Sequence, residues 1–235
     1  YFNQVFEEPV LKISEQNGNV LRYGANPHQK GFFYGDFDKM FTKGVSSVLD
    51  YSVEGKEEEA QFDAALAMTL KTVVFAAERE AIPFAVFKPT GFGRIDLYEK
   101  VGSKQVLTEA EQAEWARVVE RFHKVCKEAH QRDVALLIDA EETWMQDAAD
   151  DLVAEMMRTY NKEKAIVFNT LQMYRWDRMD YLKKLHEQAK VEGFYIGMKL
   201  VRGAYMEKEN ARAEERNYIS PICISKQATD DNYNA

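Results

Sequence analysis

The sequence predicts an α/β fold with a parallel sheet, which we interpret as part of a (βα)8 TIM-type barrel with five of its eight strands present. Three observations support this interpretation. Short β-rich runs alternate with segments of helical periodicity, each gap can hold a crossover helix, and each run ends at a polar residue. An open, doubly wound sheet shares the first two features. The third favours the barrel, which arranges its site around the carboxyl ends of consecutive strands.

The expected strands follow one another along the chain, and in each of them the last position expected to face the barrel interior is polar. The strands are expected at residues 45–50, 84–88, 134–139, 165–169 and 197–202. The polar side chains are Asp50, Lys88, Asp139, Asn169 and Lys199, with Tyr205 just beyond the fifth strand. Because the carboxyl ends of parallel strands meet at one edge of a sheet, we expect these groups to surround a common site.

Amphipathic stripes after the first four strands predict the intervening helices. The stripes cover residues 62–76, 115–129, 145–160 and 179–189. Thr108 followed by Glu111 is a capping-box pattern before the second stripe, and Gly193 is placed to end the fourth helix in a left-handed conformation.

Both ends of the chain depart from this repeat. Residues 1–43 are rich in aromatic residues, Gly and Asn and have no helical stripe, so we expect two parts, 1–43 and 44–235. The chain ends at "ATDDNYNA", before the three further strands that a closed barrel needs. We therefore expect a truncated barrel with open sheet edges.

Composition excludes several classes of function. The net charge is −8 and the basic residues are mixed among acidic ones, which argues against a nucleic-acid partner. The sequence has no run of about 18 apolar residues and no signal-peptide pattern, so we expect a cytoplasmic protein without a membrane span. Cys126 and Cys223 are far apart and should be free thiols in a reducing compartment.

The expected strand ends contain groups that could carry chemistry. An unpaired Asp139 carboxylate inside a barrel would be costly, so we expect an ion pair with Lys88. That pair could be structural, or it could fix charge beside a cofactor or substrate. Glu141 and Glu142 are more simply an acidic first turn that complements a helix dipole.

Two further groups of residues could bind a ligand or could have a purely structural role. The amides of Asn169 and Gln172 suit the edge of a heterocycle, but amides also tie loops together. His123, Cys126 and His130 share a helix face, but Cys126 lies in the apolar stripe, so we favour packing and expect no metal.

Six segments occur in the order, and roughly at the spacing, found in proline dehydrogenases. They are "VLDYSVEGKE", "FKPTGFGR", "LLIDAEETWMQ", "IVFNTLQMYRWDRMDYL", "KLVRGAYMEKENARAEE" and "ATDDNYNA". Residues 44–235 thus resemble the branch of that family shared by some bacteria and eukaryotes. The resemblance implies a (βα)8 barrel that holds FAD, oxidises L-proline to pyrroline-5-carboxylate, and passes electrons to a quinone or another acceptor. Peripheral contact with the inner membrane is compatible with this activity.

The resemblance also implies roles for individual residues. Lys88, Asp139 and Tyr205 fall on catalytic positions that line the flavin and the proline. Lys199 stands where the family often has an arginine beside the flavin, and lysine cannot make a forked contact. The implied cofactor-binding residues are Asn169, Gln172, Lys199, Arg202, Gly203 and Ala204.

Glu54 matches a gate position that pairs with an arginine of the family's final helix. That helix supplies the arginines that bind the proline carboxylate, and it lies beyond the residues of this sequence. We therefore expect impaired turnover of proline.

A second resemblance concerns residues 1–43. "LRYGANPHQKGFFYGDFDKMF" resembles the start of the transformylase domain of the bifunctional purine-biosynthesis enzyme, AICAR transformylase/IMP cyclohydrolase. Arg22 and Tyr23 would match its phosphate-contacting pair, although that family usually has a larger residue in place of Ala25. The resemblance implies a join of two fragments near Lys43–Gly44, so the alternatives to an enzyme are a non-catalytic chimera or a transformylase fragment.

Overall fold

The computed structural model of the protein describes residue 37, residues 39–51 and residues 55–235. At its centre is a parallel sheet of five strands in the order β1-β2-β3-β4-β5. The strands are β1 (Val48–Asp50), β2 (Phe84–Phe87), β3 (Ala135–Ile138), β4 (Val167–Gln172) and β5 (Met198–Val201). Strand order follows chain order without reversal, which confirms the α/β fold and the sequential parallel arrangement typical of a barrel arc.

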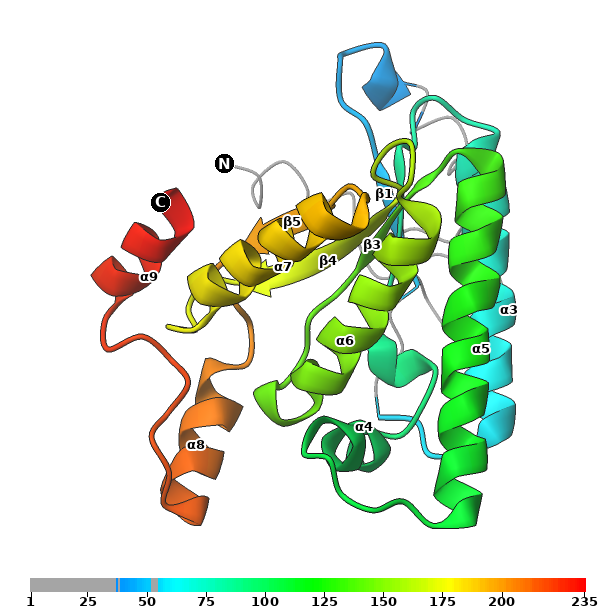
Figure 1. The fold of residues 1–235 in the computed structure, drawn as a ribbon. Coiled ribbons are helices and arrows are strands. Elements are labelled where there is room, and N and C mark those ends of the chain that lie inside the picture. Colours follow the sequence, from blue (N-terminus) through cyan, green and yellow to red (C-terminus); the bar gives the residue numbers. More distant parts are fainter. Residues whose placement is uncertain (1–36, 38, 52–54) are drawn as a thin grey trace, which may run out of the picture.

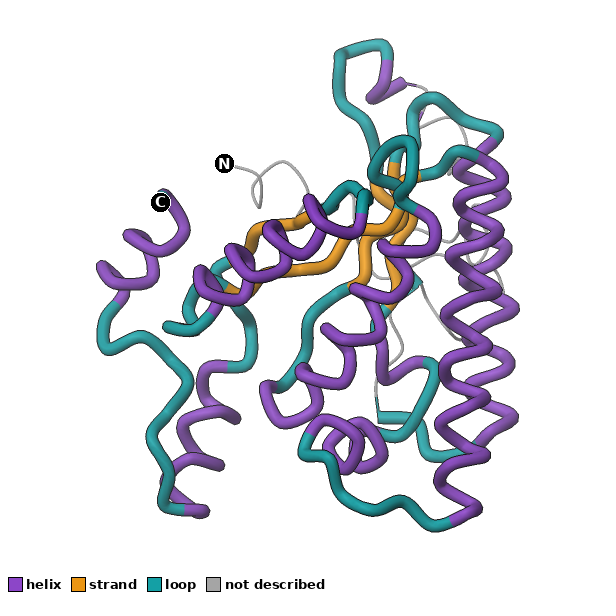
Figure 2. Tube along the Cα trace, in the orientation of Figure 1, coloured by secondary structure: helices purple, strands orange, loops and turns teal. Residues whose placement is uncertain are grey.

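Helices between successive strands form an outer layer around this arc (Figures 1 and 2). They are α3 (Glu59–Ala77), α5 (Glu109–Arg132), α6 (Thr143–Tyr160) and α7 (Arg178–Glu192). Helix α3 contacts α5, α5 contacts α6, and α6 contacts α7, so the helices neighbour one another in chain order. All four coincide with the predicted stripes, because burial of one face against the sheet creates the helical periodicity.

Three of the α-helices after residue 58 were not predicted from the sequence. They are α4 (Ile95–Gly102), α8 (Met206–Arg216) and α9 (Lys226–Asn234). Helix α4 has only eight residues, and α8 buries only Glu209 and Ala213. Such short or largely polar helices lack the repeated apolar positions that reveal an amphipathic stripe.

The core lies between the outer face of the sheet and the helices. The Phe87 ring on β2 stacks on Phe92 with centroids 4.6 Å apart and meets the edge of Phe122 on α5 at 5.2 Å. The opposite face of the strands forms the inner side of the arc, where Phe84 and Phe168 meet edge to face at 6.2 Å. Alternate residues of each strand therefore serve the core and the inner face.

The predicted helix ends are confirmed. Thr108 Oγ1 accepts from Glu111 N at 3.2 Å while the Glu111 carboxylate accepts from Thr108 N at 2.9 Å. Gly193 ends α7 with φ of 67°, a left-handed conformation that glycine adopts without steric cost.

Helix α3 is long and apolar enough to cross a membrane by length and composition. In the fold it packs against α5 and β2, and Phe62, Leu66 and Val73 are buried. These contacts bury one face of α3 in the core.

Both cysteines are free thiols. Cys126 is buried in the core, and this burial raises the pKa of its thiol. His123, one turn away, places Nδ1 3.1 Å from Tyr160 Oη. Within residues 55–235 and the described part before them, the structure forms no His, Cys, Asp and Glu cluster that could hold a metal.

Candidate active site

Four of the predicted site residues lie on the inner face, three of them beyond the carboxyl ends of strands and Lys199 near the start of β5. Lys88 follows β2, Asp139 follows β3, Lys199 lies within β5, and Tyr205 precedes α8. Each comes from a different strand or loop, so the parallel sheet brings together residues that are far apart in the sequence.

Asp139 forms an ion pair with Lys199, not with Lys88 as predicted. Both partners are largely shielded from solvent, with side chains 18% and 27% exposed. Lys199 is opposite Thr170 in the β4–β5 register, and the Thr170 hydroxyl donates to Ile138 O at 2.8 Å. The lysine side chain therefore passes over a small residue on β4 to reach the end of β3. This contact could be predicted only if the register between β4 and β5 were known.

Lys88 contacts Tyr205 instead. Its Nζ donates to Tyr205 Oη at 3.0 Å and lies 5.7 Å from the centre of the tyrosine ring. Tyr205 is buried, and Lys208 of α8 lies 5.4 Å from its ring centre. The phenol is thus held between the loop after β2 and the start of α8, in an electropositive setting.

Asn169 does not face the interior, contrary to its predicted parity. Its Nδ2 donates to Asp150 Oδ1 of α6 at 2.9 Å and to Tyr181 Oη of α7 at 3.2 Å. The predicted run ended at residue 169, whereas β4 continues to Gln172, and its inward set is Phe168, Thr170 and Gln172. Asn169 therefore belongs to the layer between the sheet and the helices.

Gln172 lies on the inner face, but its amide ties loops together. It is buried, and its Nε2 donates to Glu141 O at 2.7 Å. This bond joins the end of β4 to the loop after β3. Of the two roles considered above for the amide, it is the structural one, a link between loops.

The segment after β5 includes Arg202, Gly203 and Ala204. Arg202 is exposed, and its Nε pairs with Asp230 Oδ1 of α9 at 2.7 Å while its guanidinium lies over the Tyr233 ring at 4.6 Å. Ala204 is also exposed. Gly203 has φ of 135°, and a Cβ at this position would lie 2.6 Å from the Tyr174 ring. The close approach that this glycine permits is therefore to Tyr174.

We expect Gly203→Ala to destabilise the protein by about 1–3 kcal/mol, because it adds a steric clash to a backbone conformation that alanine rarely adopts. Urea unfolding followed by circular dichroism measures the change. Gly193→Ala is the matched control, since Gly193 also has positive φ but open space where Cβ would lie. Equal losses in the two variants would mean that packing against Tyr174 contributes nothing.

Glu54, the predicted gate, lies outside the described residues, as do residues 1–36 of the N-terminal segment.

Two carboxylates near the site have roles that the sequence did not indicate. Glu141 and Glu142, interpreted above as an acidic first turn, bind specific partners. Glu141 accepts from Thr90 N at 2.9 Å and Thr90 Oγ1 at 2.6 Å, and Glu142 pairs with Lys208 at 2.7 Å. Thr90 is 51 residues before Glu141, so no local pattern could reveal this contact.

A buried ion pair between α6 and α7 supports the outer side of the site. Arg178 Nη1 lies 2.6 Å from Asp150 Oδ2, and the two side chains are 5% and 4% exposed. Burial lowers the pKa of Arg178, but bonds with Asp177 and Asp150 outweigh it and raise the pKa overall. Asp150 Oδ1 also accepts from Gln146 Nε2 at 2.8 Å. Asp150 lies next to the apolar stripe of α6 in the sequence, and this position is the sequence feature that could have indicated a buried acid.

Asp177 makes part of the stability dependent on pH. Burial raises the pKa of its carboxyl, but hydrogen bonds from Arg178 and Arg175 prevail and lower the pKa to about 2. Because this pKa is below its ordinary value of 3.8, the contribution is present above about pH 4 and lost as the pH falls toward 2.

We expect Asp177→Asn to reduce the free energy of unfolding by about 1–2 kcal/mol at pH 6, after allowance for solvent screening. The difference from the unmodified protein should shrink as the pH falls from 4 toward 2, because Asp177 is protonated near pH 4 in the unfolded protein but only near pH 2 in the folded one. Urea unfolding at a series of pH values measures it. Asp180→Asn removes an exposed acid from the same helix and is the control; a difference that stays constant with pH would contradict the account.

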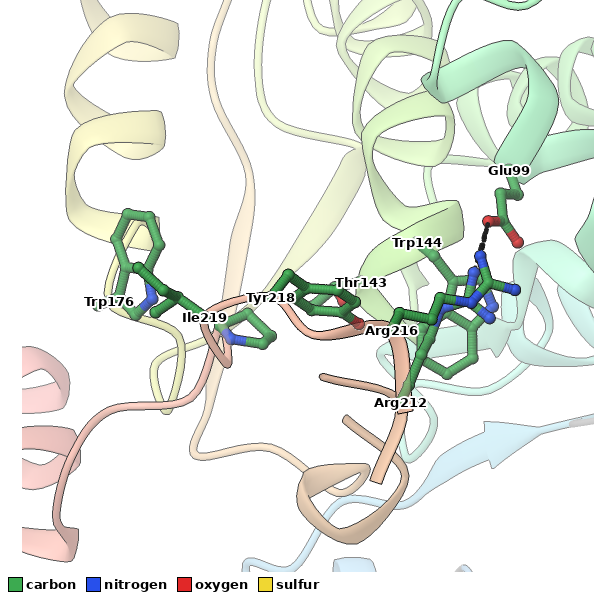
Figure 3. A pocket seen from close by; sticks show the side chains of 9 residues that line it. Glu99, Thr143, Trp144, Trp176, Arg212, Arg216, Tyr218 and Ile219 are labelled. Atoms are coloured by element: carbon green, nitrogen blue, oxygen red, sulfur yellow. Dashed lines mark hydrogen bonds and ion pairs between the residues drawn. The ribbon is translucent and has the colours of Figure 1, made fainter. Parts of the chain in front are cut away.

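A separate hollow of about 340 Å³ lies between α4, α6 and α8 (Figure 3). Arg212 and Arg216 pair with Glu99 in it, and the Arg212 guanidinium stacks over Trp144 at 4.2 Å. None of the predicted site residues lines this hollow. Its arginines therefore serve to join α8 to α4 and α6.

A family model and several curated proteins match this chain. The model described as "Proline dehydrogenase" matches residues 35–235, which includes residues 35–43 of the segment assigned above to the N-terminal part. "Carbapenem antibiotics biosynthesis protein CarD" of Pectobacterium carotovorum subsp. carotovorum is 37% identical over 192 residues, covering 82% of this chain and 50% of that protein. "Proline dehydrogenase 1, mitochondrial" of Homo sapiens is 41% identical over 126 residues, covering 54% of this chain and 21% of that protein.

Solved structures show the same fold. Proline utilization A from Bdellovibrio bacteriovorus, inactivated by N-propargylglycine, matches with a TM-score of 0.70 at 17% identity, over 85% of this chain and 22% of that one. The protein of the same name from Corynebacterium freiburgense has a TM-score of 0.68 at 17% identity, over 86% and 20% of the two chains. The chain thus spans half the length of the carbapenem protein and about a fifth of the others. With its sequential parallel sheet and a family match over most of its length, the chain belongs to the proline dehydrogenase family.

Proposed function

We propose that the protein oxidises L-proline to pyrroline-5-carboxylate with FAD as cofactor, at the inner-face group of Lys88, Asp139, Lys199 and Tyr205. The observation that carries the proposal is this group itself. It combines an Asp139–Lys199 pair with a Lys88–Tyr205 pair at the carboxyl ends of parallel strands, in a chain of the proline dehydrogenase family. The carboxyl edge of such a sheet is where this architecture binds its ligands.

The residues present fit a flavin in part. A flavin offers hydrogen-bonding atoms along one edge of a flat ring and an anionic diphosphate. The ammonium of Lys199 suits the ring edge, as does the amide oxygen of Gln172, whose Nε2 is already bound to Glu141 O, and the exposed guanidinium of Arg202 suits a phosphate. Asn169 bonds to the helix layer and is not part of this set. When bound, FAD supplies the two-electron acceptor for the reaction.

The protein's own side chains then bind and orient proline. The Asp139 carboxylate, fixed by Lys199, attracts the proline ammonium group and lowers its freedom to rotate. Lys88 holds the phenol of Tyr205 against the substrate ring and adds a positive charge for the substrate carboxylate. In this account the residues position two reactants, and proximity supplies most of their catalytic effect.

The remaining expectations belong to this proposal. The electron acceptor is a quinone or another carrier, and the protein acts in the cytoplasm with peripheral contact at the inner membrane. By their resemblance to the purine enzyme, residues 1–43 derive from a source other than the barrel, although the family match begins at residue 35 and Phe37 and Phe41 pack against the core. If the two sources meet near Lys43, limited proteolysis should cleave there before it cleaves within 55–235.

The proposal is tested by titrating the purified chain with FAD and then adding L-proline without oxygen. Loss of the oxidised flavin absorbance in a single turnover detects even slow oxidation. D-proline is the control for specificity. We expect flavin binding and faster bleaching with L-proline.

Bound FAD that is reduced no faster by L-proline than by D-proline would contradict the proposed activity. Absence of FAD binding would favour the alternative of a non-catalytic fragment.

A further inference from the structure

Two threonine–glutamate contacts join the loops that hold the proposed site residues. In the first, the carboxylate of Glu141 accepts from both the amide and the hydroxyl of Thr90, at 2.9 and 2.6 Å. Thr90 lies in the turn Pro89–Gly91 after β2, and Glu141 lies in the loop after β3. Glu141 is 1% exposed and Thr90 4%.

The second contact is of the same kind and joins the start of α6, after β3, to α8, after β5. The carboxylate of Glu209 in α8 accepts from the amide and the hydroxyl of Thr143, at 2.6 and 2.5 Å. Thr143 is the first residue of α6, so a carboxylate from another helix caps that amino terminus. Glu209 is 0% exposed.

These contacts lie next to the site residues in the chain. Thr90 is two residues after Lys88, Glu141 is two residues after Asp139, and Glu209 is one helical turn after Tyr205. The loops after β2 and β3 and the start of α8 are thereby joined in series. Since the Lys88–Tyr205 hydrogen bond links the first and last of them, the structure closes a ring of contacts around the inner face.

Burial distinguishes these contacts from ordinary helix capping. Thr108 and Glu111 form the same kind of pair, but they are three residues apart on an exposed surface. A buried carboxylate is costly unless its oxygens are hydrogen-bonded, so Glu141 and Glu209 hold their threonines at defined positions. We propose that Glu141 and Glu209 are positioning residues that fix Lys88, Asp139 and Tyr205 relative to one another. Their catalytic consequence, but not the placement itself, rests on the proposed function.

Same-size substitutions test the proposal with limited risk to folding. Glu141→Gln and Glu209→Gln each keep one acceptor and lose the other, along with the charge. Thr90→Ser and Thr143→Ser keep both donors and serve as conservative variants. Thr108→Val removes the hydroxyl of the surface pair and is the control for a loss of capping away from the site.

The first measurement needs neither FAD nor activity. Lysines are converted to ¹³C-dimethyl lysines, and the NMR signal of Lys88 is assigned by its absence in Lys88→Arg. We expect both glutamine variants to shift this signal toward those of exposed lysines, because Lys88 and Tyr205 move apart. The serine variants and Thr108→Val should leave it in place. Hydrogen exchange of the Thr90 and Thr143 amides should accelerate by about tenfold or more in Glu141→Gln and Glu209→Gln, respectively.

The second measurement is the single-turnover rate of flavin reduction by L-proline. We expect a fall of about 10- to 100-fold in the glutamine variants, because small misplacements of reacting groups are costly. If the amides open and the melting temperature falls while the Lys88 signal stays unchanged, the two glutamates are merely structural and the proposal is overturned. If the unmodified protein is not reduced by L-proline, the proposed function fails, and the Lys88 signal still decides the positioning role.

Discussion

Replacement of Asp150 by alanine is expected to lower the free energy of unfolding by about 3–5 kcal/mol, because it removes the buried partner of the Arg178 guanidinium and leaves only the partly exposed Asp177. The loss also removes an acceptor for Asn169 and Gln146. Since both side chains of the ion pair are about 5% exposed, water cannot replace the missing carboxylate. Urea unfolding at neutral pH measures the change.

Two controls separate the ion pair from other effects. Asp151→Ala removes the neighbouring exposed acid on α6 and should cost far less. The double variant Asp150→Leu with Arg178→Met should be more stable than Asp150→Ala, because no unpaired charge remains buried. If Asp150→Ala and Asp151→Ala cost the same, the buried ion pair does not stabilise the fold.

The second large effect concerns the proposed chemistry. We expect Asp139→Asn to reduce the rate of flavin reduction by L-proline about 100- to 1,000-fold, because it removes the charge that orients the substrate amine and frees Lys199. FAD affinity should change much less. Stopped-flow absorbance under anaerobic conditions, at several proline concentrations, separates binding from reduction.

Asp133→Asn is the matched control for Asp139. Asp133 forms a surface ion pair with Lys164, and it adopts a left-handed conformation that asparagine tolerates well. We expect no change in the reduction rate for this variant. Similar losses at Asp133 and Asp139 would show that the effect reports general damage and would remove Asp139 from the site.

The sheet and its main helices could be predicted because their signals are local. Period-2 and period-3.6 patterns arise from burial of one face, and the box at Thr108 and the cap at Gly193 involve residues only a few positions apart. Helix α8 was not predicted because it lacks such a local signal. Its buried residues are Glu209 and Ala213, which form no apolar stripe.

The site was less predictable because its contacts depend on strand register and on distant partners. A three-residue error in the end of β4 reversed the expected side of Asn169. The Asp139 partner differed because Lys199 crosses Thr170, which only the β4–β5 register reveals. Glu141 and Thr90 are 51 residues apart, and Glu209 and Thr143 are 66 apart. The resemblance named Lys88, Asp139, Lys199 and Tyr205 as site residues, but the contacts that each of them makes required the structure.

The central claim is that FAD binds at the carboxyl ends of β3, β4 and β5. Hydrogen–deuterium exchange with and without FAD tests it directly on the whole chain. We predict slower exchange in residues 139–142, 172–175 and 199–205, with no change at the hollow around Glu99 and Arg212. Protection confined to that hollow, or absent from all three segments at saturating FAD, would contradict the claim.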